Sequence, residues 1–431
     1  MSRYTDNQIA GKKLMLLGGV RAACEIIKEA HKYGVLVYET DYLEDSPAKK
    51  YADKAFMVSC TDVDAVVTLC REEGVDGVFT GYTDSLLPFA EQICRKLNFP
   101  FWGNSENIAM SIDKKLFKTA CEKSGVPVVP WKLVNPSNYK DELQDIQLPV
   151  VFKPVDNSGG RGVYKCYKQE DLMSLCEQSF SFSKSKEVIV ERLMNAHSEF
   201  SAYYIMNHGD IYLTGMGDKY VVEVVKDIAP VSSSMVMPSI HLEQWIKDVN
   251  PVMMKFFKDN QMNNGYVFIQ GFYENHQFYI HEMGYRLNGG FTFKFVEHFC
   301  GYNQVHQLVK FSLTGEMDKE EVSKSDPFLG GNKGMALELS LKQGVIGSIE
   351  GVEEVSNHPG VMEFYQLKEV GAVLSSNGTT AQTFADIYVT AESEQELQEL
   401  VKYIEDTIKV FDISGKNMLQ PMLDPYSIKF S

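Results

Sequence analysis

The sequence predicts a protein of mixed α/β and α+β class, arranged as three successive units. Residues 13–110 alternate apolar strand patterns with amphipathic helix patterns, and this βαβ rhythm predicts a parallel sheet covered by helices. Residues 266–284 contain two aromatic, β-branched runs joined by a polar turn, which indicates antiparallel strands. Residues 333–374 combine strand patterns with glycine turns, and a helix pattern follows from Ser393. The length of 431 residues agrees with this division, because one domain typically takes about 150 residues.

The first predicted unit covers residues 1–110. It begins with an apolar strand and glycines at residues 14–19, followed by an amphipathic helix over 21–34 and a strand over 35–41. The two glycines and Asp41 raise the alternative of a dinucleotide site. The G-x-G-x-x-G fingerprint of such a site is absent, so we do not favour it.

The second predicted unit covers residues 111–315 and contains the segment VVFKPVDNSGGRGV at residues 150–163. Its glycines at 159, 160 and 162 permit positive φ and expose successive backbone N–H groups, which suits an anion. Residues 163–167 then alternate like a strand, whereas a G-x-x-x-x-G-K-[ST] loop must open a helix. The pattern predicts a strand–loop–strand flap over phosphates, with an ordinary glycine-rich hairpin as the alternative.

The hairpin expected at residues 266–290 carries Gln270 on its first strand, Glu282 on its second strand and Arg286 beyond. Mg²⁺ takes hard oxygen ligands and usually shares them with nucleotide phosphates, so this pattern favours a Mg²⁺–phosphate site. The alternative is a hairpin with one buried, paired carboxylate of structural importance only.

Together, a lysine-bearing strand, an SGGRG hairpin and a strand pair ending in E-x-G-x-R resemble the ATP-grasp superfamily. The resemblance covers roughly residues 13–420 and favours the branch of carbamoyl-phosphate synthetases, biotin carboxylases and amino-acid ligases. It implies an N-terminal pre-ATP-grasp domain, an ATP-grasp domain with a lid at roughly residues 128–188, and a C-terminal α+β lobe over residues 316–431.

The resemblance also implies ATP and Mg²⁺ as cofactors, with Mn²⁺ as a possible replacement. Gln270 and Glu282 would hold the metal, and Arg286 would act in catalysis by neutralising the transferring phosphoryl group. The adenine would lie at residues 191–194, the ribose at Glu199 and the phosphates at two lysines and the flap. The expected ATP-binding residues are Lys114, Lys153, Ser158, Gly159, Gly160, Arg161, Gly162, Glu191, Arg192, Leu193, Met194 and Glu199. The candidate substrate residues are Thr83, Asp84, Lys219 and Asn288, although Asp84 could equally cap the helix that follows it.

Two positions depart from the family pattern. Gln270 stands where family members commonly have Glu, and Gly284 stands where they commonly have Asn. Gln still supplies an oxygen ligand, but Gly284 supplies no side chain. We therefore expect either one well-bound and one poorly bound Mg²⁺, or recruitment of Asn288 in place of residue 284.

Composition indicates a soluble cytoplasmic enzyme. The net charge of −16 argues against a nucleic-acid partner, because nucleic-acid binding needs a basic face. No apolar run approaches the ~18–20 residues that span a bilayer, and the N-terminus lacks the apolar core of a signal peptide. The eight cysteines form no C-x-x-C pattern, so neither zinc nor a disulfide framework is indicated.

The function expected from the resemblance is that of an ADP-forming, ATP-dependent carboxylate–amine ligase that works through an acyl phosphate. Its partners would be a small carboxylate and a small amine, and a homodimer is possible. Phosphoryl transfer depends on positioning and charge neutralisation, so a protein nucleophile is not required. One alternative is a bicarbonate-using enzyme similar to carbamoyl-phosphate synthetase or biotin carboxylase. The other is a catalytically degenerate ATP-binding module.

Overall fold

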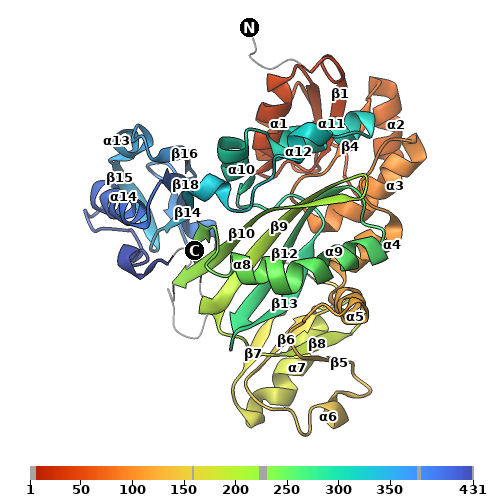
Figure 1. Ribbon diagram of the computed structural model, residues 1–431, viewed down its shortest axis with the longest axis vertical. Coiled ribbons are helices and arrows are strands. Elements are labelled where there is room, and N and C mark those ends of the chain that lie inside the picture. The colour runs from red at the N-terminus through yellow and green to blue at the C-terminus, as the bar shows by residue number, and fades with distance from the viewer. Residues whose placement is uncertain (1–5, 158–159, 223–230, 376–379, 430–431) are drawn as a thin grey trace.

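The computed structural model describes residues 6–157, 160–222, 231–375 and 380–429, and within them the strands form four sheets (Figure 1). The N-terminal sheet is parallel, in the order β3-β2-β1-β4, as the βαβ rhythm predicted. Its strands are β1 (Lys13–Leu17), β2 (Leu36–Thr40), β3 (Lys54–Phe56) and β4 (Gly77–Phe79). The helical segments around it are α1 (Ala23–Lys32), η1 (Pro47–Lys50), α2 (Val63–Glu73), η2 (Asp84–Leu86) and α3 (Leu87–Leu97).

The loop after β1 is closed by the protein itself. The N–H of Gly19 donates to the carboxylate of Asp41 at 2.9 Å. A Cβ on Gly19 would come within 2.2 Å of the Ser46 hydroxyl and 2.5 Å of the Glu39 carboxylate. These contacts leave no space for a pyrophosphate against this glycine, which agrees with the missing dinucleotide fingerprint.

A small antiparallel sheet in the order β5-β8-β6-β7 forms the lower part of the molecule in Figure 1. Strands β6 and β7 pair through Val150 and Cys166, so the SGGRG segment joins two antiparallel strands and opens no helix, as predicted. The elements are β5 (Trp131–Val134), α6 (Tyr139–Glu142), β6 (Val150–Pro154), β7 (Tyr164–Cys166), η3 (Gln169–Asp171), α7 (Leu172–Ser181) and β8 (Val188–Arg192).

The largest sheet has the order β13-β12-β9-β10-β11-β14-β18-β16 and extends across the boundary expected near residue 315. β11 pairs with β14 through Ser234 and Leu337, so the C-terminal strands continue the central sheet. Its strands are β9 (Glu199–Asn207), β10 (Asp210–Val222), β11 (Val231–Met237), β12 (Gly265–Glu274), β13 (Gln277–Gly284), β14 (Lys333–Ser340), β16 (Val361–Gln366) and β18 (Thr383–Ala391).

Helices connect and cover these sheets. Before the C-terminal part they are α4 (Ser105–Ile112), α5 (Lys114–Ser124), η4 (Ala196–Ser198), α8 (Leu242–Gln244), the π-helical η5 (Trp245–Val249), α9 (Asn250–Asp259), α10 (Phe293–Cys300), α11 (Gln304–Thr314), α12 (Lys319–Val322) and η6 (Leu329–Gly331). A further small sheet contains β15 (Gly344–Glu350), β17 (Val373–Leu374) and β19 (Lys409–Asp412). The remaining segments are α13 (Val352–Ser356), η7 (Thr380–Gln382), α14 (Glu394–Thr407) and η8 (Pro425–Ser427).

Two helix starts follow the local chemistry of the sequence. Ser393 caps α14, because its hydroxyl accepts from the N–H of Glu396 at 3.2 Å. Pro251 lies in the first turn of α9, where its missing N–H has no helical partner to lose. None of the helices in the described ranges is both long and apolar enough to cross a bilayer.

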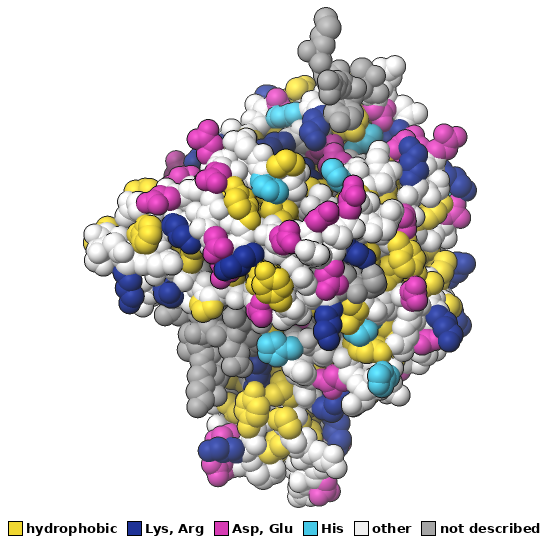
Figure 2. Space-filling view, turned by 60° about the vertical axis from the view of Figure 1, so that its left-hand side comes forward, with side chains coloured by type: hydrophobic (Ala, Val, Ile, Leu, Met, Phe, Trp, Pro, Cys, Tyr) yellow, Lys and Arg dark blue, Asp and Glu magenta, His cyan; other side chains and the backbone are white. Residues whose placement is uncertain are grey.

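Charge is interspersed over the face shown in Figure 2, where acidic and basic side chains alternate without a large patch of one sign. The net charge of −16 is therefore not gathered on this face. A binding site for an anionic ligand must obtain its positive charge locally, from the side chains of one cleft.

Candidate active site

The predicted metal ligands lie directly opposite each other. β12 and β13 are joined by a two-residue turn in which Asn275 and His276 have φ of 52° and 62°, as a type I′ hairpin turn requires. The turn sets the register as far as Gly271 and Ile280, and a bulge between Gln270 and Gly271 then shifts it by one residue, so that Gln270 pairs with Glu282. Among the described residues, neither the Gln270 amide nor the Glu282 carboxylate forms a hydrogen bond or an ion pair.

This donor set fits Mg²⁺. Both side chains offer hard oxygen atoms, and Mg²⁺ typically takes one or two protein ligands together with phosphate oxygens and water. No group of three or more His, Cys, Asp and Glu side chains in the described part of the chain is placed to hold a metal. The site therefore matches a metal that arrives with a nucleotide better than a permanently held structural metal.

Packing against Phe268 explains why residue 284 is a glycine. A Cβ at this position would lie 2.2 Å from the ring of Phe268, so the ring occupies the space of any side chain there. The Arg286 guanidinium lies over the same ring, 5.0 Å from its centroid, in cation–π geometry. The departure from the family pattern at residue 284 thus makes room for the aromatic support of Arg286.

Arg286 is held by the N-terminal unit. Its Nε and Nη2 donate to the two carboxylate oxygens of Asp84 at 2.8 and 2.5 Å, and its Nη1 donates to the Leu287 carbonyl at 2.7 Å. Asp84 is therefore engaged with Arg286 and does not cap η2. Neighbouring Thr83 makes no side-chain capping bond. A bidentate pair of this kind fixes the orientation of the guanidinium.

A buried cluster of three charges lies behind the residues expected to bind phosphate. Glu191 on β8 forms ion pairs with Lys118 on α5 at 2.7 Å and with Lys153 on β6 at 2.6 Å. The side chains of Lys118 and Glu191 are 0% and 2% exposed. Burial alone would raise the pKa of Glu191, but the charges of Lys153 and Lys118 outweigh it and lower that pKa to about 2. Glu191 is therefore a fixed anion that positions two lysines.

The pKa values of the two lysines paired with Glu191 shift in opposite directions. Burial lowers the pKa of Lys118, and the attraction of Glu191 offsets only part of that effect. For Lys153 burial also lowers the pKa, but Glu191 outweighs it and the net direction is upward. Burial and the charge of Lys153 hold the pKa of His281 well below its usual value, so its imidazole is neutral at pH 7. Lys153 thus keeps its charge at the edge of the cleft.

A cleft of about 360 Å³ lies between the small antiparallel sheet and the β12–β13 hairpin. Lys114 borders it and donates to the Asn157 carbonyl at 2.7 Å. Of the predicted ATP-binding residues, those that line this cleft are Lys114, Lys153, Gly160, Arg161, Glu191, Arg192, Leu193, Met194 and Glu199. Gly162 is described but does not line it, since it packs against Phe182 and Pro154. Ser158 and Gly159 lie outside the described residues.

The strand end expected to bind the base is partly occupied. The N–H groups of Arg192 and Leu193 donate to the carbonyls of Pro130 and Pro149 at 3.2 and 3.0 Å. The Arg192 guanidinium is directed to the hairpin, where it pairs with Glu274 and lies 5.1 Å from the Tyr279 ring centroid. The N–H of Met194 is not among the backbone donors found in the described residues. Of these three amides, it is the one left for a base.

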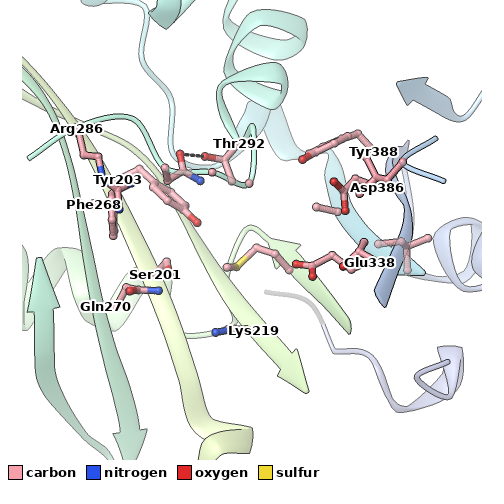
Figure 3. A pocket seen from close by; sticks show the side chains of 18 residues that line it. Ser201, Tyr203, Lys219, Phe268, Gln270, Arg286, Thr292, Glu338, Asp386 and Tyr388 are labelled. Atoms are coloured by element: carbon pink, nitrogen blue, oxygen red, sulfur yellow. Dashed lines mark hydrogen bonds between the residues drawn. The ribbon is translucent and has the colours of Figure 1, made fainter. Parts of the chain in front are cut away.

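A second cavity of about 480 Å³ adjoins the cleft (Figure 3). Lys219 lines both spaces and pairs with Glu199 at 3.1 Å, so the carboxylate expected to bind ribose is engaged in this structure. Gln270 lines the second cavity, whereas Glu282 lines the cleft. The paired metal-ligand candidates therefore stand at the junction of the two spaces.

Asn288 also lines the second cavity, but it is a poor replacement for a side chain at residue 284. Its Oδ1 accepts from the hydroxyls of Tyr266 and Thr292, at 3.0 Å each. An amide nitrogen does not bind Mg²⁺, and the amide oxygen is already used. The expectation that Asn288 is recruited as a metal ligand is not supported by these contacts.

Several residues of the site were not expected from the sequence. Lys118 follows Lys114 by four residues on α5, and this spacing could have shown that both lysines share one face. His281 neighbours Glu282, but no local signal shows that it is buried against Lys153. The C-terminal residues of the second cavity had no sequence signal at all; they are Ala336, Leu337, Glu338, Leu367, Thr383, Asp386 and Tyr388.

Comparison with known proteins agrees with this geometry. Residues 113–311 match the family of the ATP-binding domain of the carbamoyl-phosphate synthase L chain. The chain has the fold of the ATP-grasp proteins. Solved structures of similar fold include an L-amino acid ligase from Bacillus licheniformis, with a TM-score of 0.79 at 16% identity over 94% of this chain and 99% of that one.

Another solved structure of similar fold is the biotin carboxylase domain dimer of Hydrogenobacter thermophilus 2-oxoglutarate carboxylase, in complex with MgADP, ADP and bicarbonate. Its TM-score is 0.74 at 17% identity, over 95% of this chain and 91% of that one. At the sequence level, the formate-dependent phosphoribosylglycinamide formyltransferase of Sulfurisphaera tokodaii is 26% identical over 198 residues, 44% of this chain and 49% of the relative. The chain spans about half the length of the curated relatives it matches.

Proposed function

We propose that the protein is an ADP-forming ligase that joins a small carboxylate to a small amine through an acyl phosphate. The observation that carries this proposal is the junction of the two cavities. Gln270 and Glu282 pair across β12 and β13, one facing each cavity, and Lys219 borders both. A γ-phosphate bound at this junction would be in reach of a carboxylate in the second cavity.

The chemistry needs two displacements. A carboxylate oxygen attacks the γ-phosphorus, the bond to the β-phosphate oxygen breaks, and ADP leaves. The amine nitrogen then attacks the acyl carbon, the bond to the phosphate oxygen breaks, and the nitrogen loses a proton as phosphate departs. Both steps gain most from positioning and charge neutralisation, so the absence of a nucleophile signature in the sequence agrees with the proposal.

The proposed roles follow from the contacts of each side chain. Lys114 and Lys153 would bind phosphate oxygens, the second held in place by Glu191. Mg²⁺ on Gln270 and Glu282 would neutralise charge on the phosphates. Arg286, fixed by Asp84, would face the acyl phosphate at the rim of the second cavity.

The test is ADP release from Mg-ATP with amino acids, other small carboxylates, amines and bicarbonate, supplied singly and in pairs. ADP formed only with particular carboxylate–amine pairs is the expected result. ADP formed with bicarbonate and no amine would identify a bicarbonate-using enzyme instead. Bound ATP without ADP under any pairing would identify an ATP-binding module and contradict the ligase proposal.

A matched pair of variants links this activity to the metal site. Glu282→Ala should raise the Mg²⁺ concentration needed for half-maximal ADP release, because it removes the one carboxylate of the pair. Glu243→Ala, at an exposed position of α8, should leave that concentration unchanged. An equal effect of both variants would contradict the assignment of Glu282.

A further inference from the structure

The wall of the second cavity that faces Lys219 and Arg286 comes from the C-terminal strands (Figure 3). Glu338 on β14 pairs directly with Asp386 on β18, so both carboxylates lie on one face of the sheet. Tyr388 shares that face, because residues two apart on a strand point the same way. One wall of the cavity is thus cationic and the other anionic.

Asp386 has no fixed cationic partner. Among the described residues it forms no ion pair within 4.0 Å and no hydrogen bond. The charge of Arg21 reaches it, but that guanidinium donates to the carbonyls of Gln366 at 2.7 Å and Leu367 at 3.3 Å. Burial and the neighbouring Glu338 raise the pKa of Asp386 to about 7, with Arg21 opposing. A cation at this carboxylate would relieve the repulsion between the two acids.

Two buried hydroxyl groups on the same wall point to a ligand independently. Tyr388 and Thr383 are 2% and 5% exposed, and both line the cavity. Neither hydroxyl has a hydrogen-bond partner among the described residues. Figure 3 shows the Tyr388 hydroxyl directed into the cavity. Neither hydroxyl oxygen is among the fully enclosed polar atoms that lack a partner, so both face the open space of the cavity and can accept a hydrogen bond from a ligand there.

We propose that this wall is the binding site for the amine substrate, which binds as an ammonium group and gives one proton to the Asp386 carboxylate before its nitrogen attacks the acyl carbon. Asp386 supplies negative charge, and the hydroxyl oxygens of Tyr388 and Thr383 accept N–H donors. An ammonium group carries three donors and no acceptor, which matches a wall of carboxylates and hydroxyls. The inference rests on the proposed function, because it gives the place and the chemical class of the amine in that reaction.

The side of the second cavity opposite Asp386 carries the two basic residues Arg286 and Lys219. Arg286 and Lys219 are paired with Asp84 and Glu199, so their side of the cavity offers N–H donors to a substrate carboxylate, and the acyl phosphate formed there faces the amine across the cavity. A third cavity of about 470 Å³ shares Gly289, Leu367 and Asp386 with the second cavity. This cavity has room for the organic substituent of an amine whose ammonium group lies at Asp386. The expected substrate is therefore a primary amine with a substituent, larger than ammonia.

The test compares n-butylamine, a cation at pH 8, with n-butanol, which has the same chain and no charge. Calorimetric titration of the full chain should show that it binds butylammonium and does not bind butanol measurably. Asp386→Asn should weaken butylammonium binding by at least about tenfold, which corresponds to about 1.4 kcal/mol. Asp406→Asn, at an exposed position of α14, is the matched control and should leave binding unchanged.

Tyr388→Phe keeps the aromatic packing and removes only the hydroxyl, so it tests the site if Asp386→Asn folds poorly by thermal unfolding. It should weaken butylammonium binding by a few-fold. Equal binding of butylammonium and butanol, or binding unchanged in both variants, would overturn the proposal.

The two proposals can fail separately. Asp386-dependent binding of butylammonium without ADP release for any substrate pair would reject the ligase and retain the ammonium site. ADP release with amines whose KM is the same in wild type and Asp386→Asn would retain the ligase and reject the site.

Discussion

Replacing Glu191 by Gln removes the negative charge between Lys118 and Lys153 while keeping the shape of the side chain. Lys118 is 0% exposed and would retain only the Val129 carbonyl, at 3.2 Å, as an acceptor. The pKa of Glu191 is lowered from 4.5 to about 2, which corresponds to about 3 kcal/mol of folding stability at pH 7. Breaking a buried ion pair typically costs about 3–5 kcal/mol. The pKa shift and this typical cost therefore give a similar loss of folding stability for Glu191→Gln.

The pH dependence has a definite sign. A carboxyl group whose pKa is lower in the folded than in the unfolded state stabilises the fold above the unfolded value of 4.5. This contribution is lost as the pH falls from 4.5 towards 2, because the unfolded protein takes up the proton in this range while the folded protein does not yet do so. The difference between wild type and Glu191→Gln should therefore be constant from pH 7 to about pH 5 and shrink to about 1 kcal/mol at pH 3.

Urea unfolding at pH 7 and pH 3 measures both quantities. The matched control is Glu187→Gln, because Glu187 forms a more exposed ion pair with Lys115 at 2.9 Å. Such pairs contribute only about 0–1 kcal/mol. If Glu191→Gln unfolded within about 0.5 kcal/mol of wild type at pH 7, the reasoning that this anion stabilises two buried lysines would be refuted.

Three further variants test the site. Arg286→Ala should lower turnover on the order of 10²–10³-fold while ATP affinity stays nearly constant, and unchanged ADP release would contradict its assignment. Lys153→Ala should weaken ATP binding by about tenfold or more in calorimetry, since charge-assisted hydrogen bonds contribute about 1.5–3 kcal/mol, and equal affinity would exclude it from the phosphate site. Gly284→Ala should lower thermal stability and turnover, because its methyl group would meet the Phe268 ring at 2.2 Å. Adding Phe268→Leu should restore part of the stability, and no restoration would show that the ring is not the obstacle.

Local patterns predicted the parts of the site that are continuous in sequence. The hairpin and the placing of Gln270 and Glu282 on its two strands follow from alternation and turn chemistry within one short segment. Their direct opposition depends on the bulge at Gln270 and Gly271, which alternation did not predict. The antiparallel pairing of β6 and β7 around the glycine-rich segment follows from alternation after Val163.

Contacts between distant segments could not be predicted from one sequence. Asp84 and Arg286 are 202 residues apart, and nothing near Asp84 distinguishes an ion-pair partner from a helix cap. Lys118 is buried where α5 meets Glu191 of β8, a residue 73 positions further along the chain, so the sequence showed only a lysine on a helix. Asp386 and Tyr388 enter the site because β18 joins the central sheet, which is a matter of topology and carries no local signal.

The junction of β11 and β14 has a mechanical consequence. Because the ladder from β13 to β16 is one hydrogen-bonded body, the cationic and anionic walls of the second cavity cannot separate without breaking strand pairing. The β5-β8-β6-β7 sheet has strand ladders of its own and is joined to the central sheet by contacts such as the Arg192–Glu274 ion pair and the bond from the Val129 N–H to the Ile280 carbonyl, so a movement of this sheet would break these contacts and leave the central ladder intact. Opening for nucleotide exchange would then leave the spacing between the two substrate walls unchanged. The distance between the two sides of the second cavity would then stay the same through each reaction cycle, and this distance would select the length of the substrate.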